Sequence, residues 1–333
     1  MFGTKQVGRR DFLKLTGAAS ASALLLPAMA TPALSLLAPQ QAQASSVSSA
    51  AMITLPSLHK RAGNYSTNEY ETSLLVYEGE LLTIAFLRDI TRFTGLGIRV
   101  RRFFSGALLA ENSWPGSMGS VMVINGEIHI FGTTNDATYG NSVIHSVLDR
   151  DFKPSTPRRL MTTGSAWTVE KGGNTFWNTE ITRVLDGYIL VVETQADGDV
   201  FFKSSDLINW APVGRSFNRN PTTYAGCPTI DFYRGTFYLT YLADGGDGHY
   251  FTRIARSTDL VDWERFKGNA TLGPEVCVVT TDPDGISASD LSYAEYDGKT
   301  YCTYMVSDQT SWAVSRTGVY LGRIPDLYRE FFP

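Results

Sequence analysis

The chain contains the stretch Ser204-Ser205-Asp206-Leu207-Ile208-Asn209-Trp210, and a second copy of its pattern, Ser257-Thr258-Asp259-Leu260-Val261-Asp262-Trp263, begins 53 residues later. Both copies read S-x-D-L-x-[N/D]-W. Ser and Asp side chains close turns through hydrogen bonds to nearby backbone groups, and Leu and Trp can pack beneath such a turn. A strand-turn-strand pattern precedes each copy, so the motif predicts the recurring corner of a repeated β-unit. We expect a structural role for the corner residues, since turns position sites more often than they form them.

Five segments have the pattern of two strands joined by a tight turn that contains glycine. The turn glycines are Gly79, Gly126, Gly187, Gly235 and Gly298. Asn-Gly and Asp-Gly are favoured hairpin turns. The glycines are 47, 61, 48 and 63 residues apart, which suits units of four short strands joined by loops of variable length. The sequence therefore predicts an all-β protein, a five-bladed β-propeller. A β-sandwich is the competing architecture, but it does not require five equivalent hairpins.

The composition supports this fold class. Outside the N-terminus no stretch of ten or more residues shows helical periodicity, while Tyr, Phe, Val, Thr and Gly are frequent, as in strands and turns. One blade cannot bury both of its faces, so five stacked blades explain why roughly 280 residues form one domain. We therefore expect a single domain over residues 45–333.

The first 44 residues are predicted to be a targeting segment. Gly8-Arg9-Arg10-Asp11-Phe12-Leu13-Lys14 resembles the twin-arginine export motif and lacks the usual Ser or Thr at its first position. An Ala-rich apolar stretch follows, and Ala42-Gln43-Ala44 provides a cleavage site before Ser45. Prolines interrupt the apolar stretch, which argues against a retained membrane anchor. The segment predicts export in the folded state by the twin-arginine translocase, and a periplasmic or extracellular location.

Charge, cysteine and histidine patterns exclude several classes of function. The formal net charge is −4 and no basic run alternates with aromatic residues, so nucleic acid is not an expected partner. Cys227, Cys277 and Cys302 allow at most one disulfide, and the four histidines lack zinc-site spacing. The Asp/Gly loop 244–248 invites calcium but lacks EF-hand spacing. We predict no cofactor and no metal, with calcium as the alternative.

The paired corners, the aromatic hairpin Gly235–Tyr241 and the hairpin Gly298–Tyr301 are similar to five-bladed β-propeller glycoside hydrolases of families 32, 43, 62 and 68 and their relatives. The resemblance covers nearly all of the expected mature chain. It implies three carboxylates that project from the innermost strands into a funnel on the propeller axis. They would act as general acid, as general base or nucleophile, and as a group that adjusts the pKa of the acid.

The innermost strand of each blade is expected to be the strand before the turn. Six to ten residues upstream of the turn glycines lie Glu69 and Glu71 in blade one, Glu180 in blade three and Asp290 in blade five, whereas blades two and four offer Gly119, Ser120, Gly226 and Cys227. The resemblance implies a Glu followed by a small residue and Pro as general acid. The chain instead has Gly226-Cys227-Pro228, so either the catalytic carboxylates lie on other blades or the protein binds a sugar without cleaving it.

Glu180, Asp290 and Glu71 are the candidate catalytic residues. Glycosidic cleavage needs one group to protonate the leaving oxygen and another to activate water or attack carbon. We expect Glu180 to be the general acid, because an apolar and aromatic neighbourhood at Phe176 and Trp177 should raise its pKa. Asp290 is then the base or nucleophile, and Glu71 is the third acid.

Five further residues are candidate substrate-binding groups: Trp177, Asn178, Glu193, Arg256 and Asp308. An indole face beside amide and carboxylate groups suits a sugar ring. Four of them have a structural alternative: Trp177 as a core residue, Glu193 as a strand-edge cap, Arg256 in an ion pair, and Asp308 as a loop residue.

These observations predict an exported glycoside hydrolase that acts on an oligo- or polysaccharide, at an arabinofuranosyl, xylosyl, galactosyl or fructosyl residue. The alternative is a carbohydrate-binding propeller without catalytic activity, which the missing Glu at Gly226 supports. A phosphorylase would need a cationic phosphate pocket. Arg99, Arg101 and Arg102 are clustered, but alternating exposure on a strand explains them more simply.

Overall fold

The computed structural model describes residues 53–54, 69–89, 94–162, 176–194, 197–217, 225–244, 250–266, 287–307 and 313–333. The predicted export segment, residues 1–44, lies outside these ranges. Three separate four-stranded antiparallel sheets follow one another along the chain. They consist of β2 (Glu69–Tyr77), β3 (Glu80–Asp89), β4 (Thr94–Arg102) and β5 (Leu108–Asn112); β6 (Ser117–Ile124), β7 (Glu127–Asp136), β8 (Gly140–Leu148) and β9 (Arg158–Thr162); and β10 (Phe176–Val184), β11 (Gly187–Thr194), β12 (Gly198–Ser204) and β13 (Ala211–Phe217).

The remaining strands form two further antiparallel units. One contains β14 (Ala225–Tyr233), β15 (Thr236–Asp244), β16 (Tyr250–Ser257) and β17 (Glu264–Arg265), and the other contains β18 (Ser287–Tyr296), β19 (Lys299–Ser307), β20 (Ala313–Tyr320) and β1 (Ile53–Thr54). A single parallel residue pair, Tyr250 with Ser287, joins them into one eight-stranded sheet. Because β1 pairs with β20, strands from both ends of the described chain complete the last unit.

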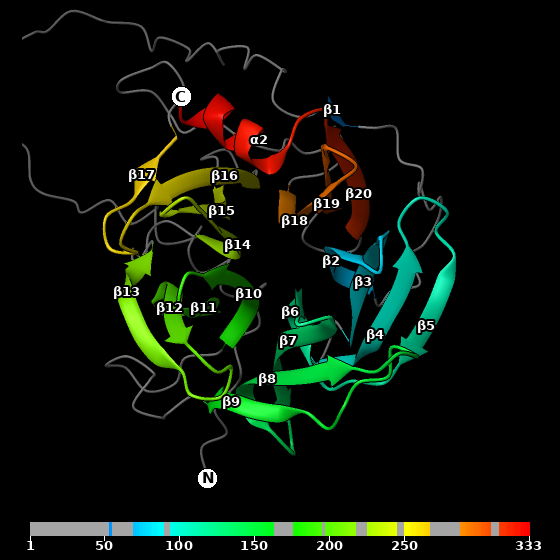
Figure 1. The fold of residues 1–333 in the computed structure, drawn as a ribbon. Helices are drawn as coiled ribbons and strands as arrows, with labels where there is room; N and C mark the ends of the chain where they lie inside the picture. Colours follow the sequence, from blue (N-terminus) through cyan, green and yellow to red (C-terminus); the bar gives the residue numbers. More distant parts are fainter. Residues whose placement is uncertain are drawn as a thin grey trace, which may run out of the picture.

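The sheets are arranged around a central axis, with β2, β6, β10, β14 and β18 innermost (Figure 1). This arrangement confirms the predicted all-β propeller. The largest hydrophobic clusters lie between consecutive sheets. For example, Ile84 and Phe86 pack with Ile130 and Ile144 between the first and second sheets. The core is therefore divided among the seams between sheets, as expected when each blade buries its faces on its neighbours.

The hairpin turns confirm four of the five predicted glycine positions. The pairs Glu78-Gly79, Asn125-Gly126, Arg234-Gly235 and Asp297-Gly298 all have positive φ at both residues, the geometry of a type I′ turn. The third hairpin differs, because Val184 pairs with Gly187 and the turn is Leu185-Asp186. Gly187 is required for another reason: a Cβ there would lie 2.2 Å from the carbonyl oxygen of Ser204 on β12.

The two S-x-D-L-x-[N/D]-W motifs form the same hydrogen-bonded corner. In the first, Asp206 Oδ1 accepts hydrogen bonds from the backbone N–H groups of Ile208 and Asn209, both at 2.8 Å. In the second, Asp259 Oδ1 accepts bonds from Val261 and Asp262 at 2.8 and 2.9 Å. The structural role expected for these corners is consistent with this geometry.

Each corner also fastens its sheet to the preceding one. Leu207 and Leu260 have φ of 63° and 61°, which turns their carbonyl groups away from the corner. Leu207 O accepts a hydrogen bond from Arg158 Nη2 on β9 at 2.7 Å, and Leu260 O accepts one from the backbone N–H of Arg215 on β13 at 2.8 Å. The repeated motif is thus a latch between neighbouring blades.

One short helix, α2 (Ile324–Phe331), follows the last strand. Pro lies in its first turn, and the Asp326 carboxylate accepts a hydrogen bond from the backbone N–H of Arg323 at 3.0 Å. Its buried face, Leu327, Tyr328 and Phe331, packs between the fourth and fifth units. Eight residues are too few to show periodicity over ten. Within the described ranges, no helix has the length and apolar character needed to cross a bilayer.

Candidate functional site

Each innermost strand contains a one-residue β-bulge at the same distance from its hairpin turn. The register shifts occur at Tyr70/Thr72, Ser117/Ser120, Phe176/Thr179, Gly226/Thr229 and Ser289/Ser292. Glu71, Met118, Cys227 and Asp290 lie in these bulges with φ between 39° and 54°, an unfavourable region for residues with a Cβ. Backbone strain of this kind is often retained where side chains must be aimed at a functional site.

The bulges surround a small pocket on the propeller axis. All five innermost strands line it. The lining contains three carboxylates, Glu71, Glu180 and Asp290, the Asn178 amide, and the hydroxyl groups of Thr72, Ser73, Thr179, Thr229 and Ser292. The structure therefore brings the three candidate catalytic acids into one cavity. Hydroxyls, an amide and carboxylates are the groups that hydrogen-bond a polyhydroxylated ligand.

Glu71 is held by a buried ion pair. Its Oε1 lies 3.1 Å from Arg88 Nη1, and the two side chains are only 6% and 5% exposed. The Arg88 guanidinium also stacks over the ring of Tyr70, 4.4 Å from the ring centroid. A buried cation next to a carboxylate stabilises its ionised form. Arg88 was not among the residues predicted from the sequence, although a single arginine within the mostly apolar strand β3 was a detectable signal.

Asp290 lines the same pocket as Glu71. It is half-buried, and Ser289 Oγ donates a hydrogen bond to its Oδ2. The strands that carry the two acids are adjacent, since the backbone N–H of Leu74 on β2 donates to Ser292 Oγ on β18 at 3.0 Å. In contrast, around the axis β6 lies between β10, which carries Glu180, and β2, and β14 lies between β10 and β18 (Figure 1).

Glu180 has a strongly raised pKa of about 8. Burial is the main cause, and the negative charge of Asp231 on β14 raises the pKa further, while the Ile181 N–H, 3.2 Å from Glu180 Oε1, opposes the shift. Glu180 therefore carries its proton at neutral pH. The raised pKa agrees with the sequence-based expectation, but Asp231 was not foreseen. An acidic residue within the strand Thr229–Tyr233 was the signal that could have identified it.

Glu193 lies behind the pocket wall rather than in it. It is 1% exposed, and its Oε2 accepts hydrogen bonds from Asn178 Nδ2 and, at 2.8 Å, from the backbone N–H of Cys227. This position differs from the predicted contact with substrate. Glu193 instead fixes the Asn178 amide and the bulge of β14, so that Asn178 is the member of the pair that lines the pocket.

Two other predicted binding residues lie away from the pocket lining. Trp177 is 4% exposed and packs with Met118, Cys227 and Leu242, so its ring cannot present a face to a sugar, and the core alternative holds. Arg256 pairs with Glu264 at 2.7 Å, and its guanidinium lies over the ring of Phe332, which agrees with the ion-pair alternative. Asp308 lies outside the described residues.

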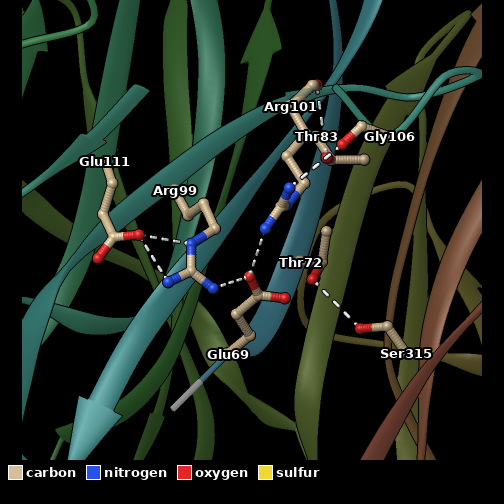
Figure 2. A network of polar contacts seen from close by, with 8 residues as sticks. All are labelled: Glu69, Thr72, Thr83, Arg99, Arg101, Gly106, Glu111 and Ser315. Carbon is tan, nitrogen blue, oxygen red and sulfur yellow. Dashed lines mark hydrogen bonds and ion pairs between the residues drawn. The ribbon is translucent and has the colours of Figure 1, made fainter. Parts of the chain in front are cut away.

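The arginines of the first sheet form an ion-pair network with Glu69 and Glu111 (Figure 2). Arg99 lies between the two carboxylates, with Nε 2.8 Å from Glu111 Oε2, and also contacts Glu69 Oε1. Arg101 Nη2 lies 3.4 Å from Glu69 Oε1, and its Nη1 donates to Gly106 O at 3.2 Å. These guanidinium groups are engaged with carboxylates of their own sheet and do not line the axial pocket, so they provide no phosphate site there.

A metal site is not found in the part of the chain that the structure describes, where no group of three or more His, Cys, Asp or Glu side chains is placed to hold an ion. Most of the Asp/Gly loop considered for calcium lies outside the described residues. Cys227 and Cys302 are buried.

No protein-family model matches the sequence, and no curated protein matches it at the sequence level. Solved structures do match the fold. An α-L-arabinofuranosidase from Podospora anserina in complex with cellotriose superposes with a TM-score of 0.59 at 12% identity, over 78% of this chain and 92% of that chain.

The catalytic domain of a family 62 α-L-arabinofuranosidase from Coprinopsis cinerea gives a TM-score of 0.59 at 12% identity, over 80% of this chain and 95% of the other. A thermostable family 43 glycoside hydrolase gives 0.54 at 12% identity, over 76% and 88%. At such low identity the likeness establishes the fold alone, which is the β-propeller seen in these glycoside hydrolases.

Proposed function

We propose that this protein is a glycoside hydrolase whose catalytic carboxylates are Glu180, Asp290 and Glu71. The observation that carries the proposal is their arrangement: a carboxyl group that holds its proton at neutral pH faces the pocket from β10, and two further carboxyl groups enter from the adjacent strands β18 and β2. Hydrolysis requires such a division between a proton donor and a group that activates water or attacks carbon.

Glu180 is the proposed general acid. It would donate its proton to the glycosidic oxygen as the bond to the anomeric carbon breaks. Asp290 is the proposed base or nucleophile, which either takes a proton from the attacking water or forms a covalent glycosyl intermediate that water then cleaves. Glu71, paired with Arg88, would supply negative charge near the oxocarbenium-like transition state.

The Asn178 amide and the pocket hydroxyls are the proposed sugar-binding groups. Asn178 is held by Glu193, so it needs little reordering when a ligand binds. The solved structures with this fold include arabinofuranosidases and a complex with cellotriose, which supports an oligo- or polysaccharide substrate. We propose an arabinofuranosyl, xylosyl, galactosyl or fructosyl residue as the group that enters the pocket.

A second candidate function is carbohydrate binding without catalysis. It is favoured by Cys227, which stands in the bulge of β14 next to the position where the resemblance implied a general acid. In that case the carboxylates would hydrogen-bond sugar hydroxyls and no bond would break.

We also propose that the chain is exported in the folded state by the twin-arginine translocase, cleaved before Ser45, and released to the periplasm or beyond. The motif at Arg9-Arg10 and the Ala42-Gln43-Ala44 site support this proposal. Cleavage there retains β1, which begins at Ile53 and completes the last sheet. Replacement of both arginines by lysine should leave the precursor in the cytoplasm, and mature protein outside despite this change would contradict the route.

The decisive experiment measures hydrolysis of aryl glycosides and of plant and bacterial polysaccharides by the chain from Ser45. Glu180→Gln is compared with Glu78→Gln, a control at an exposed hairpin turn. We expect wild type to hydrolyse at least one substrate. Glu180→Gln should lower the rate of that hydrolysis by about two to four orders of magnitude, and Glu78→Gln should leave it unchanged. Absence of turnover across the panel, together with sugar binding that survives Glu180→Gln, would instead support the binding function.

A further inference from the structure

The hydroxyl of Tyr328 reaches the innermost strands although α2 is not part of the repeated sheets. Tyr328 Oη donates a hydrogen bond to Asp231 Oδ2 at 2.8 Å, and Tyr293 Oη on β18 lies 2.7 Å from Tyr328 Oη. A phenol has one proton to donate. Since that of Tyr328 goes to Asp231, Tyr293 must donate to Tyr328. Two hydroxyl groups, from β18 and α2, therefore form a chain that ends on Asp231.

Packing fixes the position of Tyr328. Its ring is 2% exposed and stacks on Tyr238 of β15 with 3.8 Å between the ring centroids and 2° between the planes. Leu327 and Phe331 anchor the same face of α2 in the cluster between the fourth and fifth units. The hydroxyl is thus held in place by the helix rather than by a mobile side chain.

Asp231 in turn faces the strand that carries Glu180. Its Oδ1 accepts a hydrogen bond from the Phe232 N–H at 2.7 Å and lies 3.5 Å from Thr182 Oγ1, and Thr182 is two residues after Glu180 on the same face of β10. Hydrogen bonds from Tyr328 and Phe232 fix the orientation of the Asp231 carboxylate. A negative charge at this position opposes ionisation of Glu180, in agreement with its raised pKa.

We propose that α2 is part of the candidate active site, with Tyr328 as a positioning residue that holds the Asp231 carboxylate against β10, the strand that carries the proposed general acid Glu180. The inference rests on the proposed function, in which Glu180 protonates the leaving oxygen. It adds to that function a dependence on the C-terminal helix, whose residues are not part of the pocket lining.

Among the titratable groups around Tyr328, Asp231 is the one that supplies the negative charge acting on Glu180. Burial raises the pKa of Tyr293 and Tyr328 well above 10, and it also raises the pKa of Tyr238, so these phenols stay neutral near pH 8. Arg256, the cation that acts on Tyr238, is paired with Glu264.

The test is a site-resolved titration of Glu180 in the full mature chain, without substrate. The ¹³C signal of the Glu180 carboxyl is assigned by its loss in Glu180→Gln and followed by NMR against pH. Asp231→Asn should lower the pKa of Glu180, because the negative charge of Asp231 is one of the causes that raise it. Tyr328→Phe should lower it in the same direction. Tyr320→Phe is the matched control, because it removes a hydroxyl that bonds Glu330, an exposed residue of α2, and should leave the titration unchanged.

A Glu180 titration that is the same in Tyr328→Phe and wild type would overturn the inference, provided that both unfold at similar temperatures. If Tyr328→Phe does not fold, Tyr293→Phe removes the outer member of the hydroxyl chain and must shift the titration in the same direction for the inference to stand. The proposed function fails separately. A shifted titration in a protein that hydrolyses no glycoside supports the control of Glu180 by α2 and rejects the enzyme, whereas hydrolysis with an unresponsive titration rejects only the role of α2.

Discussion

Replacement of Glu180 by Gln should make the protein more stable at alkaline pH while it abolishes turnover. The folded protein holds the Glu180 proton up to a pKa of about 8, whereas the unfolded chain releases it near the ordinary value of 4.5. Between these values the folded state binds more protons, so the stability that this proton contributes is complete below about pH 4.5 and is lost as pH rises through 8. The shift corresponds to at most about 5 kcal/mol, at about 1.4 kcal/mol per unit.

We expect about 2–3 kcal/mol of this difference, because the carboxyl lines an open pocket and water there reduces the penalty. The amide in the Glu180→Gln variant cannot ionise, so the stability of this variant relative to wild type should be near zero at about pH 4.5, increase as pH rises, and level off above about pH 8. Urea unfolding across this pH range measures the difference, with Glu78→Gln as the exposed control. Parallel pH dependences for Glu180→Gln and wild type would refute the raised pKa and, with it, the assignment of Glu180 as proton donor.

Three further outcomes are expected. Gly214→Ala should lower the free energy of unfolding by about 2–4 kcal/mol, because its Cβ would lie 2.3 Å from Leu260 O at a φ of +71° and break the latch between blades. Gly126→Ala, at a φ of +84° with open space around it, should lower it by only about 1 kcal/mol. Urea unfolding measures both variants, and equal losses would contradict the latch. Burial lowers the pKa of His145 from 6.5 to about 3, so stability should fall as pH drops below 6.5, by about 2–3 kcal/mol near pH 4.5, and a variant His145→Gln that keeps the full slope would show that another group titrates. Asp290→Asn should lower kcat by at least about a hundredfold with intact folding by circular dichroism, and near-normal turnover would remove Asp290 from the reaction.

The repeated turns and corners made the propeller recognisable from the chain alone. Glycine and its partner in Asn125-Gly126 or Asp297-Gly298 adopt positive φ for local reasons, so the hairpins are visible without tertiary context. The same logic placed Glu71 and Asp290 near the axis, because the innermost strand and its level are set by counting back from the turn. Gly187 was misread as a turn residue, since a close approach to Ser204 demands glycine as strongly as a turn does.

The sequence by itself therefore determined the blade pattern and the carboxylates that could reach the axis, because strand alternation and turn chemistry act over a few residues. Tertiary structure alone decided which of them meet in the pocket and how they are charged. Burial, the ion pair of Glu71 with Arg88, and the approach of Asp231 to Glu180 depend on strands and a helix that are distant in the chain. Trp177 shows the same limit, since a tryptophan beside an amide and a carboxylate suits a sugar site or a core equally well, and only packing against Leu242 placed it in the core.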